Sequence, residues 1–246
     1  MRFKICFTIV LIGFAFCCFI TAFTQKKGSV DNNPPKVTIT SPNGWFNWSS
    51  IIRYSISISD KEDGSSEYNE ITANEVLLEG LYLPDASKAE KYLFARAKMS
   101  TEHPGLSMIK NSGCFNCHAT KNKLIGPSFE LIAKRYPDNP NAIDMLTKKI
   151  MNGSTGVWGD MPMPAHPALK TDQARQVISW ILKNNLNPNL TYLPGIEGAF
   201  QTIEKPIPDL SKGVYILTAS YIDHGVEGSH QIRRHGQHSV LLKNPN

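Results

Sequence analysis

The segment Cys114-Phe115-Asn116-Cys117-His118 lies near the middle of this 246-residue chain. Two thiols three positions apart, followed directly by an imidazole, are what covalent attachment of a c-type haem requires. Each sulfur can add to one vinyl group of the porphyrin, and His118 then lies beneath the iron as its proximal ligand. The same thiol spacing occurs in zinc knuckles and redox dithiols. However, no second Cys or His pair at finger spacing follows, and the surrounding pattern is helical rather than βαβ. The imidazole that follows the second thiol therefore favours haem.

A haem that carries electrons needs a second axial ligand, and the sequence offers one further along the chain. Residues 156–166 read Gly-Val-Trp-Gly-Asp-Met-Pro-Met-Pro-Ala-His. A thioether is a soft, neutral ligand that stabilises Fe(II) and raises the reduction potential. Met163 lies between two prolines, which stiffen the ligand loop and lower the entropy lost on ligation. Met163 is therefore the expected ligand, and Met161 and His166 are its competitors.

With these motifs in order, the segment resembles the small bacterial class I cytochromes c. The haem motif is followed by Gly126-Pro127, then by Trp158-Gly159, then by Pro162-Met163-Pro164, and His118 and Met163 are 45 positions apart. The resemblance implies that the Pro127 carbonyl accepts the Nδ1–H of His118. It also implies that Trp158 hydrogen-bonds a haem propionate, although an ordinary core tryptophan is the alternative. In that family the first and last helices cross and cover one haem edge.

The beginning of the chain is typical of an exported protein. Arg2 and Lys4 precede an apolar run from Ile5 to Ile20, and small residues follow it. This pattern predicts a signal peptide over residues 1–25. Because the run is almost long enough to span a bilayer, an uncleaved N-terminal anchor with membrane association is the alternative. In both cases we expect the rest of the chain in the periplasm, where c-type haem is attached.

Cysteine usage and charge narrow the possible functions. Cys6, Cys17 and Cys18 lie in the leader, and the other two of the five cysteines belong to the haem motif, so no pair is left for a structural disulfide. The 26 basic and 21 acidic residues give a formal charge of only +5. A charge this small argues against a nucleic-acid-binding protein.

Strand-like segments flank the helical one on both sides. Residues 36–40 and 50–59 alternate apolar and polar side chains, and residues 73–83 do so less cleanly. Residues 213–221 and 239–242 are the strands expected near the end of the chain. These segments resemble the opening and closing strands of bacterial immunoglobulin-like modules. The whole chain beyond the leader resembles cytochrome segments fused to bacterial sugar-dehydrogenase-like proteins.

We therefore predict a multidomain α and β protein, in which an all-α class I cytochrome c domain accompanies an immunoglobulin-like β-sandwich. The expected order is a leader over 1–25, an N-terminal β half over 28–84, the cytochrome c domain over 85–188 and a C-terminal β half over 189–246. Helices are expected over 87–99, 105–112, 141–151 and 171–182, with another beginning after Pro127. Three strands without a disulfide make a marginal sheet, whereas six or seven in two sheets make a domain. Two separate β modules are the alternative.

The predicted function is electron transfer in the periplasm through one covalently attached haem c. A dehydrogenase is the expected donor, and a downstream cytochrome or oxidase is the expected acceptor. No nucleophile–base pair stands out, so we expect no catalytic residues and no enzyme activity. The alternatives are a haem-based sensor or ligand-binding protein, and the electron-accepting subunit of a sugar or alcohol dehydrogenase complex. The expected cofactor-binding residues are Cys114, Cys117, His118, Pro127, Trp158 and Met163, of which His118 and Met163 bind the iron.

Overall fold

The computed structural model describes residues 32–207, 212–226 and 232–245. The described residues belong to one compact unit, Asp31–Asn246. The expected leader, with its three cysteines, lies outside the described residues. Within the described part of the chain, no helix combines the length and apolar character needed to cross a membrane.

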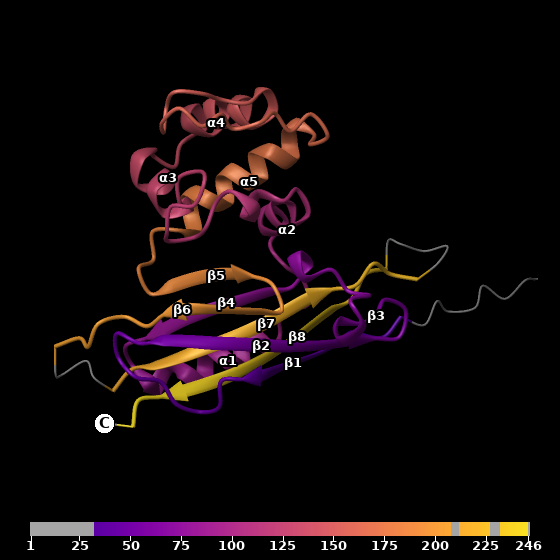
Figure 1. The fold of residues 1–246 in the computed structure, drawn as a ribbon, viewed down its shortest axis with the longest axis vertical. Helices are drawn as coiled ribbons and strands as arrows, with labels where there is room; N and C mark the ends of the chain where they lie inside the picture. The colour runs from indigo at the N-terminus through magenta and orange to yellow at the C-terminus, as the bar shows by residue number, and fades with distance from the viewer. Residues whose placement is uncertain (1–31, 208–211, 227–231, 246) are drawn as a thin grey trace, which may run out of the picture. The chain divides into compact units, whose positions relative to one another are not determined.

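The first sheet is organised around β2 (Ile51–Asp60), which pairs with three other strands (Figure 1). Its antiparallel partners are β1 (Lys36–Ser41), the short β3 (Gly64–Ser65) and β6 (Glu197–Gln201). Every second side chain of β2 is buried, as its alternating sequence predicts. Because β6 comes from the far side of the helical segment, this sheet joins strands from both ends of the described chain.

The second sheet has the strand order β5 (Leu190–Pro194), β4 (Leu77–Leu83), β7 (Val214–Ile222), β8 (His235–Lys243), all antiparallel. The central strands β4 and β7 are buried on both faces along almost their whole length. This explains why residues 73–83 alternate poorly in the sequence. The strand begins at Leu77 and not at Ala73, because residues 73–75 form a short 3₁₀ helix.

The inner faces of the two sheets share one hydrophobic core. Its fully buried members include Ile58 of β2, Leu78 of β4 and Leu217 and Tyr221 of β7. The opposite face of β4 and β7 is also covered. There α1 (Ala89–Ala97) packs against Val214 and Ile216, so the helix expected over 87–99 lies on the sheet.

The other four α-helices form a bundle beside β5 (Figure 1). They are α2 (Pro104–Asn111), α3 (Phe129–Arg135), α4 (Pro140–Asn152) and α5 (Thr171–Asn184). Three further 3₁₀ turns span Ser66–Tyr68, Ala86–Lys88 and Cys114–Asn116. The sequence marks the helix starts, because Pro104 and Pro140 each occupy a first turn and Ser128 caps α3.

The bundle depends on a close approach between α2 and α5. A side chain at Gly105 would place its Cβ 2.3 Å from the carbonyl oxygen of Gln176 and 2.7 Å from the Cβ of Trp180. Only a glycine on α2 allows this contact. Leu77 of β4 and Tyr192 of β5 are buried in the same cluster as the α2 and α5 side chains, so the sheet contributes directly to the core of the bundle.

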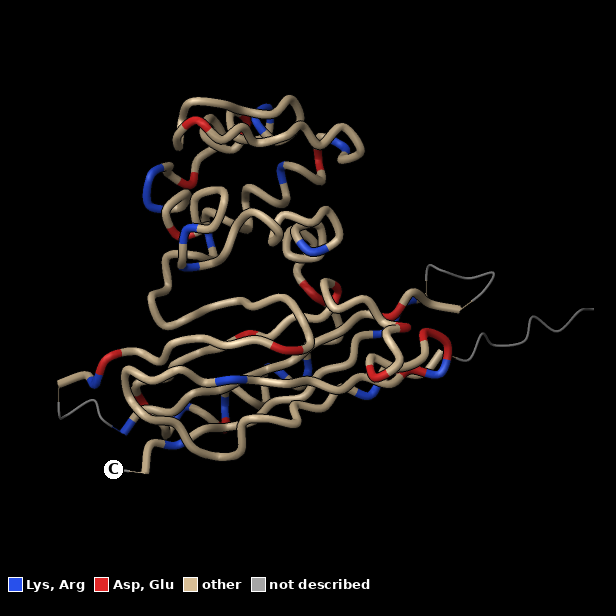
Figure 2. Tube along the Cα trace, viewed as in Figure 1, with Lys and Arg blue, Asp and Glu red and all other residues tan. Residues whose placement is uncertain are grey.

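Charged residues of both signs are interspersed along the chain in the sheets and in the helical bundle (Figure 2). Acidic residues gather at the turn after β2, where Asp60, Glu62 and Asp63 follow one another closely. In the coloured part of Figure 2 the basic residues do not line up as a continuous stripe.

Candidate functional site

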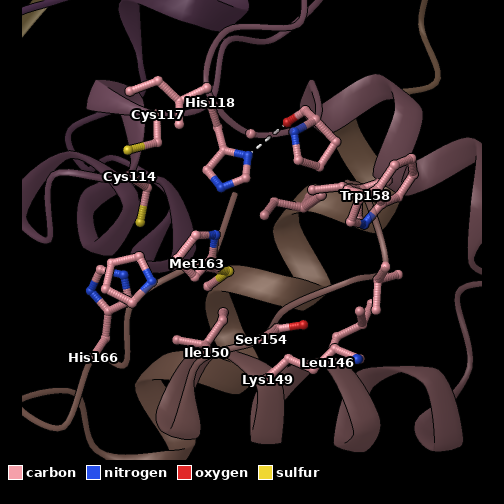
Figure 3. A pocket seen from close by; sticks show the side chains of 18 of the residues that line it. Cys114, Cys117, His118, Leu146, Lys149, Ile150, Ser154, Trp158, Met163 and His166 are labelled. Carbon is pink, nitrogen blue, oxygen red and sulfur yellow. Dashed lines mark hydrogen bonds between the residues drawn. The ribbon is translucent and has the colours of Figure 1, made fainter. Parts of the chain in front are cut away.

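The two thiols and the imidazole are brought together by a 3₁₀ turn that follows α2. The turn begins after Gly113, whose φ of 68° reverses the chain direction at the end of the helix. The carbonyl oxygen of Cys114 then accepts hydrogen bonds from the backbone N–H of Cys117 at 3.2 Å and of His118 at 3.0 Å. As a result, Cys114, Cys117 and His118 all line one cavity (Figure 3).

Both thiols are free, and the Cys114 thiol is shifted away from the thiolate form that a reactive dithiol needs. Burial is the main cause that raises the pKa of Cys114, to about 11. A reactive dithiol needs the opposite shift, toward the thiolate. Among the described residues no group of three or more His, Cys, Asp or Glu side chains could hold a metal ion. The raised pKa of Cys114 therefore disfavours the dithiol interpretation of the motif.

The imidazole of His118 is held in the orientation that an iron ligand needs. Its Nδ1 lies 2.6 Å from the carbonyl oxygen of Pro127 (Figure 3). Because a carbonyl only accepts, Nδ1 carries the proton and Nε2 keeps a free lone pair. Burial lowers the pKa of His118, which favours the neutral ring. A side chain at Gly126 would place its Cβ 2.5 Å from Cε1 of His118, so this glycine leaves the space that the ring occupies.

The loop that carries Met163 is fixed to the end of α4 by a short antiparallel bridge. The backbone N–H of Ser154 donates to the Met163 carbonyl at 3.0 Å, and the N–H of Met163 donates to the Ser154 carbonyl at 2.8 Å. The Met163 side chain enters the cavity on the side that faces His118 (Figure 3). His166 also lines the cavity, whereas Met161 lies at its edge and is 67% exposed. Burial thus favours Met163 over Met161.

The cavity has a volume of about 360 Å³ and mostly apolar walls. The walls come from α3, α4, α5 and the neighbouring segments, and include Phe129, Ile132, Tyr136, Leu146, Ile150, Leu169, Val177, Ile178 and Ile181. Two thiols, one imidazole nitrogen and one thioether converge on this apolar space. This donor set fits a haem c, which needs two sulfur attachments, two axial ligands and a dry pocket.

Trp158 lines the cavity, and its ring is held from outside. The guanidinium of Arg135 lies 4.6 Å from the centre of the Trp158 ring and donates a hydrogen bond to the Val157 carbonyl at 3.2 Å. Tyr136 packs edge to face on the same indole, with ring centres 6.4 Å apart. The sequence analysis predicted a hydrogen bond from Trp158 to a haem propionate, but not the packing of Arg135 against its indole ring.

Lys149 is a cavity residue that the sequence analysis missed (Figure 3). It lies on α4 between Leu146 and Ile150, which also line the cavity. Positions three and four apart share one face of a helix, so this spacing was the available signal. A lysine on an otherwise apolar wall is suited to a carboxylate, and haem carries two of them as propionates.

All six cofactor-binding residues expected from the sequence line this cavity. They are Cys114, Cys117, His118, Pro127, Trp158 and Met163.

The comparisons with known proteins concern the same part of the chain. The family model described as cytochrome c matches residues 104–185. Cytochrome c-552 of Hydrogenobacter thermophilus is 43% identical over 76 residues, which are 30% of this chain and 76% of that protein. Cytochrome c-551 of Pseudomonas aeruginosa is 39% identical over 75 residues, or 30% of this chain and 71% of that protein.

Among solved structures, the crystal structure of Nitrosomonas europaea cytochrome c552 is similar to this chain at 36% identity. The match covers 32% of this chain and 96% of the Nitrosomonas protein, with a TM-score of 0.31. These matches cover about a third of the chain.

Proposed function

The chain belongs to the cytochrome c family through residues 104–185, and from this we propose that it is a single-haem electron carrier. Its cofactor is one covalently attached haem c. One observation carries the proposal: two thiols, an oriented imidazole and a thioether converge on a single apolar cavity. A protein that supplies both axial ligands leaves no position for a substrate, and this suits a carrier better than an enzyme.

Each cavity residue has a defined part in this function. Cys114 and Cys117 would hold the haem through thioether bonds, and Nε2 of His118 would be one ligand to its iron. Pro127 fixes the ring of His118 through the hydrogen bond to Nδ1, which also increases the basicity of the ligand nitrogen. The Met163 thioether would be the second ligand to the iron, where a soft neutral sulfur would favour Fe(II).

Trp158 and Lys149 are assigned to the propionates. The indole N–H can donate one hydrogen bond, and the ammonium group of Lys149 supplies a positive charge in the same cavity. The packing of Arg135 and Tyr136 around the indole supports this role, because it keeps the ring in one orientation.

The haem would supply the one-electron change of valence. The protein would keep the reorganisation energy of that change low. Apolar walls exclude water, and the Ser154–Met163 bridge holds the thioether in place before and after transfer. The prolines on both sides of Met163 restrict the same loop. Little has to move when the iron changes its charge.

The remaining features of the function extend beyond the cytochrome domain. We assign the chain to the periplasm after export by the segment 1–25, with a dehydrogenase as donor and a downstream cytochrome or oxidase as acceptor. The two sheets are assigned to one immunoglobulin-like sandwich, built from 28–84 and 189–246, with the haem domain inserted between its halves. Each sheet pairs strands that precede the haem domain with strands that follow it, and this pairing supports the proposed division. Co-purification of a dehydrogenase that reduces the protein would support the donor.

The experiment that tests the carrier is the absorption spectrum of the oxidised holoprotein, compared with Met163→Ala. Met sulfur bound to Fe(III) gives a weak long-wavelength band. We expect the wild type to show this band and Met163→Ala to lose it, while the exposed Met161→Ala variant, the matched control, keeps it. A high-spin wild type without the band would contradict the carrier and favour a ligand-binding protein.

A further inference from the structure

The segment that follows the proximal histidine is fastened to the edge of the second sheet. Thr120 is 2% exposed and lies two residues after His118. Its hydroxyl donates a hydrogen bond to the Tyr192 carbonyl at 2.9 Å and accepts one from the Tyr192 N–H at 3.1 Å. The side chain of Lys121 donates to the carbonyl of Asn187, shortly before β5, at 2.7 Å. Two consecutive residues therefore tie this segment to β5 and to the turn that precedes it.

These contacts use backbone groups that β4 does not reach. β5 lies at the edge of the second sheet, on the side of the helical bundle (Figure 1). At such an edge, every second residue directs its N–H and C=O groups away from the sheet. Tyr192 is one of these residues, because both of its groups bind Thr120 and not Glu79, which lies opposite it on β4. A hydroxyl can donate and accept at once, so one threonine side chain satisfies both groups.

On its other side, the same segment is hydrogen-bonded to the residues that lead into α3. Hydrogen bonds join residues 117–120 to residues 126–130. The backbone bonds run from the N–H of Gly126 to the Cys117 carbonyl at 2.8 Å, of Phe129 to Ala119 at 3.0 Å and of Glu130 to Thr120 at 3.1 Å. The bond from Nδ1 of His118 to the Pro127 carbonyl belongs to the same set. A displacement of Thr120 therefore alters the set that orients the imidazole.

Ring contacts lead from the same tyrosine back to the proximal ligand. The Tyr192 ring packs on Trp180, with ring centres 5.1 Å apart, and Trp180 meets Phe129 edge to face at 6.3 Å. Phe129 in turn stacks on the His118 imidazole at 5.6 Å, with an angle of 14° between the planes. Tyr192 thus reaches the ligand by two routes, through its ring and through its backbone and Thr120. The sheet residue restrains both the ring and the backbone of the ligand.

We infer that Thr120 is a positioning residue, through which β5 holds the proximal ligand and helps to set the reduction potential of the haem. The inference rests on the proposed function, since it requires the iron. A hydrogen bond from Nδ1 makes Nε2 of His118 more basic, and a more basic ligand stabilises Fe(III) relative to Fe(II). The 2.6 Å bond to Pro127 depends on the placement of residues 117–120, which Thr120 ties to the sheet. Without that tie the bond weakens and the potential rises.

The test is the reduction potential of the holoprotein, from a redox titration followed in the visible spectrum. Thr120→Val removes the hydroxyl and should raise the potential, whereas Thr120→Ser keeps the hydroxyl and should stay close to the wild type. Thr202→Val is the matched control. Thr202 is 3% exposed, and its hydroxyl donates to the Asn47 carbonyl at 2.6 Å and accepts from the Ser50 N–H at 2.9 Å, beside the first sheet. Its loss should lower stability and leave the potential unchanged.

A second variant and a second readout keep the inference open to refutation if Thr120→Val folds poorly. Thr120→Ala also removes the hydroxyl, but it leaves room for a water molecule at the Tyr192 backbone, and it should shift the potential in the same direction. In the reduced, diamagnetic protein, both substitutions should speed the exchange of the His118 Nδ1 proton with solvent, as followed by nuclear magnetic resonance.

The inference is overturned by a wild-type potential or a wild-type exchange rate in Thr120→Ala or Thr120→Val. It is also overturned if Thr120→Ser shifts the potential as far as Thr120→Val, or if Thr202→Val does. A wild type with haem and the methionine-ligation band, but no shift in the Thr120 variants, refutes this inference alone. A wild type without haem contradicts the proposed function.

Discussion

Truncation of Leu77 is expected to destabilise the haem domain from a strand of the sheet. Leu77 is 1% exposed and belongs to the same buried cluster as Leu106 and Ile109 of α2 and Trp180 of α5. Removal of a fully buried leucine side chain to alanine costs about 3–5 kcal/mol. That is a large fraction of the roughly 5–15 kcal/mol by which a domain is stable. Leu77→Ala should therefore lower the denaturant midpoint of the haem domain.

The neighbouring Leu78 provides a matched control on the same strand. It is fully buried, but it faces the core between the two sheets. We would unfold the holoprotein in urea and follow the methionine-ligation band for the haem domain and far-ultraviolet circular dichroism for the whole chain. Leu77→Ala should move the haem transition more than Leu78→Ala does. A haem transition at the wild-type midpoint in Leu77→Ala, or an equal shift in both variants, would refute the shared core.

Three other predictions follow from single contacts. Gly126→Ala places a methyl group 2.5 Å from Cε1 of His118, so the imidazole ring must move. The ratio of holoprotein to apoprotein after export should therefore fall. An unchanged ratio would contradict the close packing of Gly126 against the imidazole. The hydrogen bond to Glu75 is the main cause that raises the pKa of His224 above 6.5, so its stabilisation is complete below pH 6.5 and is lost as the pH rises through the raised pKa. Accordingly, His224→Gln should lower the melting temperature more at pH 5 than at pH 8, and a loss independent of pH would exclude the ion pair. Ser128 is fully buried and its hydroxyl caps the first turn of α3, so Ser128→Ala should cost about 1 kcal/mol in urea unfolding, whereas Ser128→Thr should keep most of the cap.

The residues that line the proposed haem cavity and carry the motif could be identified in the sequence because their information is local. Cys114 and His118 lie within one turn of chain, and Met163 is marked by the prolines beside it. Lys149 is marked only by its helical spacing from Leu146 and Ile150, and Arg135 has no mark, since lysine and arginine occur on most exposed helix faces. Whether their side chains reach the site depends on which face of α3 and of α4 is directed toward the cavity in the folded protein.

The sheets were predictable only in part. The alternation of β2 reports a half-buried strand directly, whereas β4 is buried on both faces and loses its alternation. β5 and β6 were missed because both are short, β5 is half-buried and β6 is largely exposed, and Gly195, whose φ is 113°, lies between them. The pairing of Tyr192 with Glu79 depends on strand register, which a single sequence does not contain.

The most direct test of the central claim is the absorption spectrum of the reduced holoprotein before and after addition of carbon monoxide. If His118 and Met163 both bind the iron, no position is open, and the spectrum should stay unchanged at neutral pH. A shift of the main haem band on addition of the gas would mean that Met163 does not hold the sixth position. That result would contradict the electron carrier and make the molecule a ligand-binding haem protein.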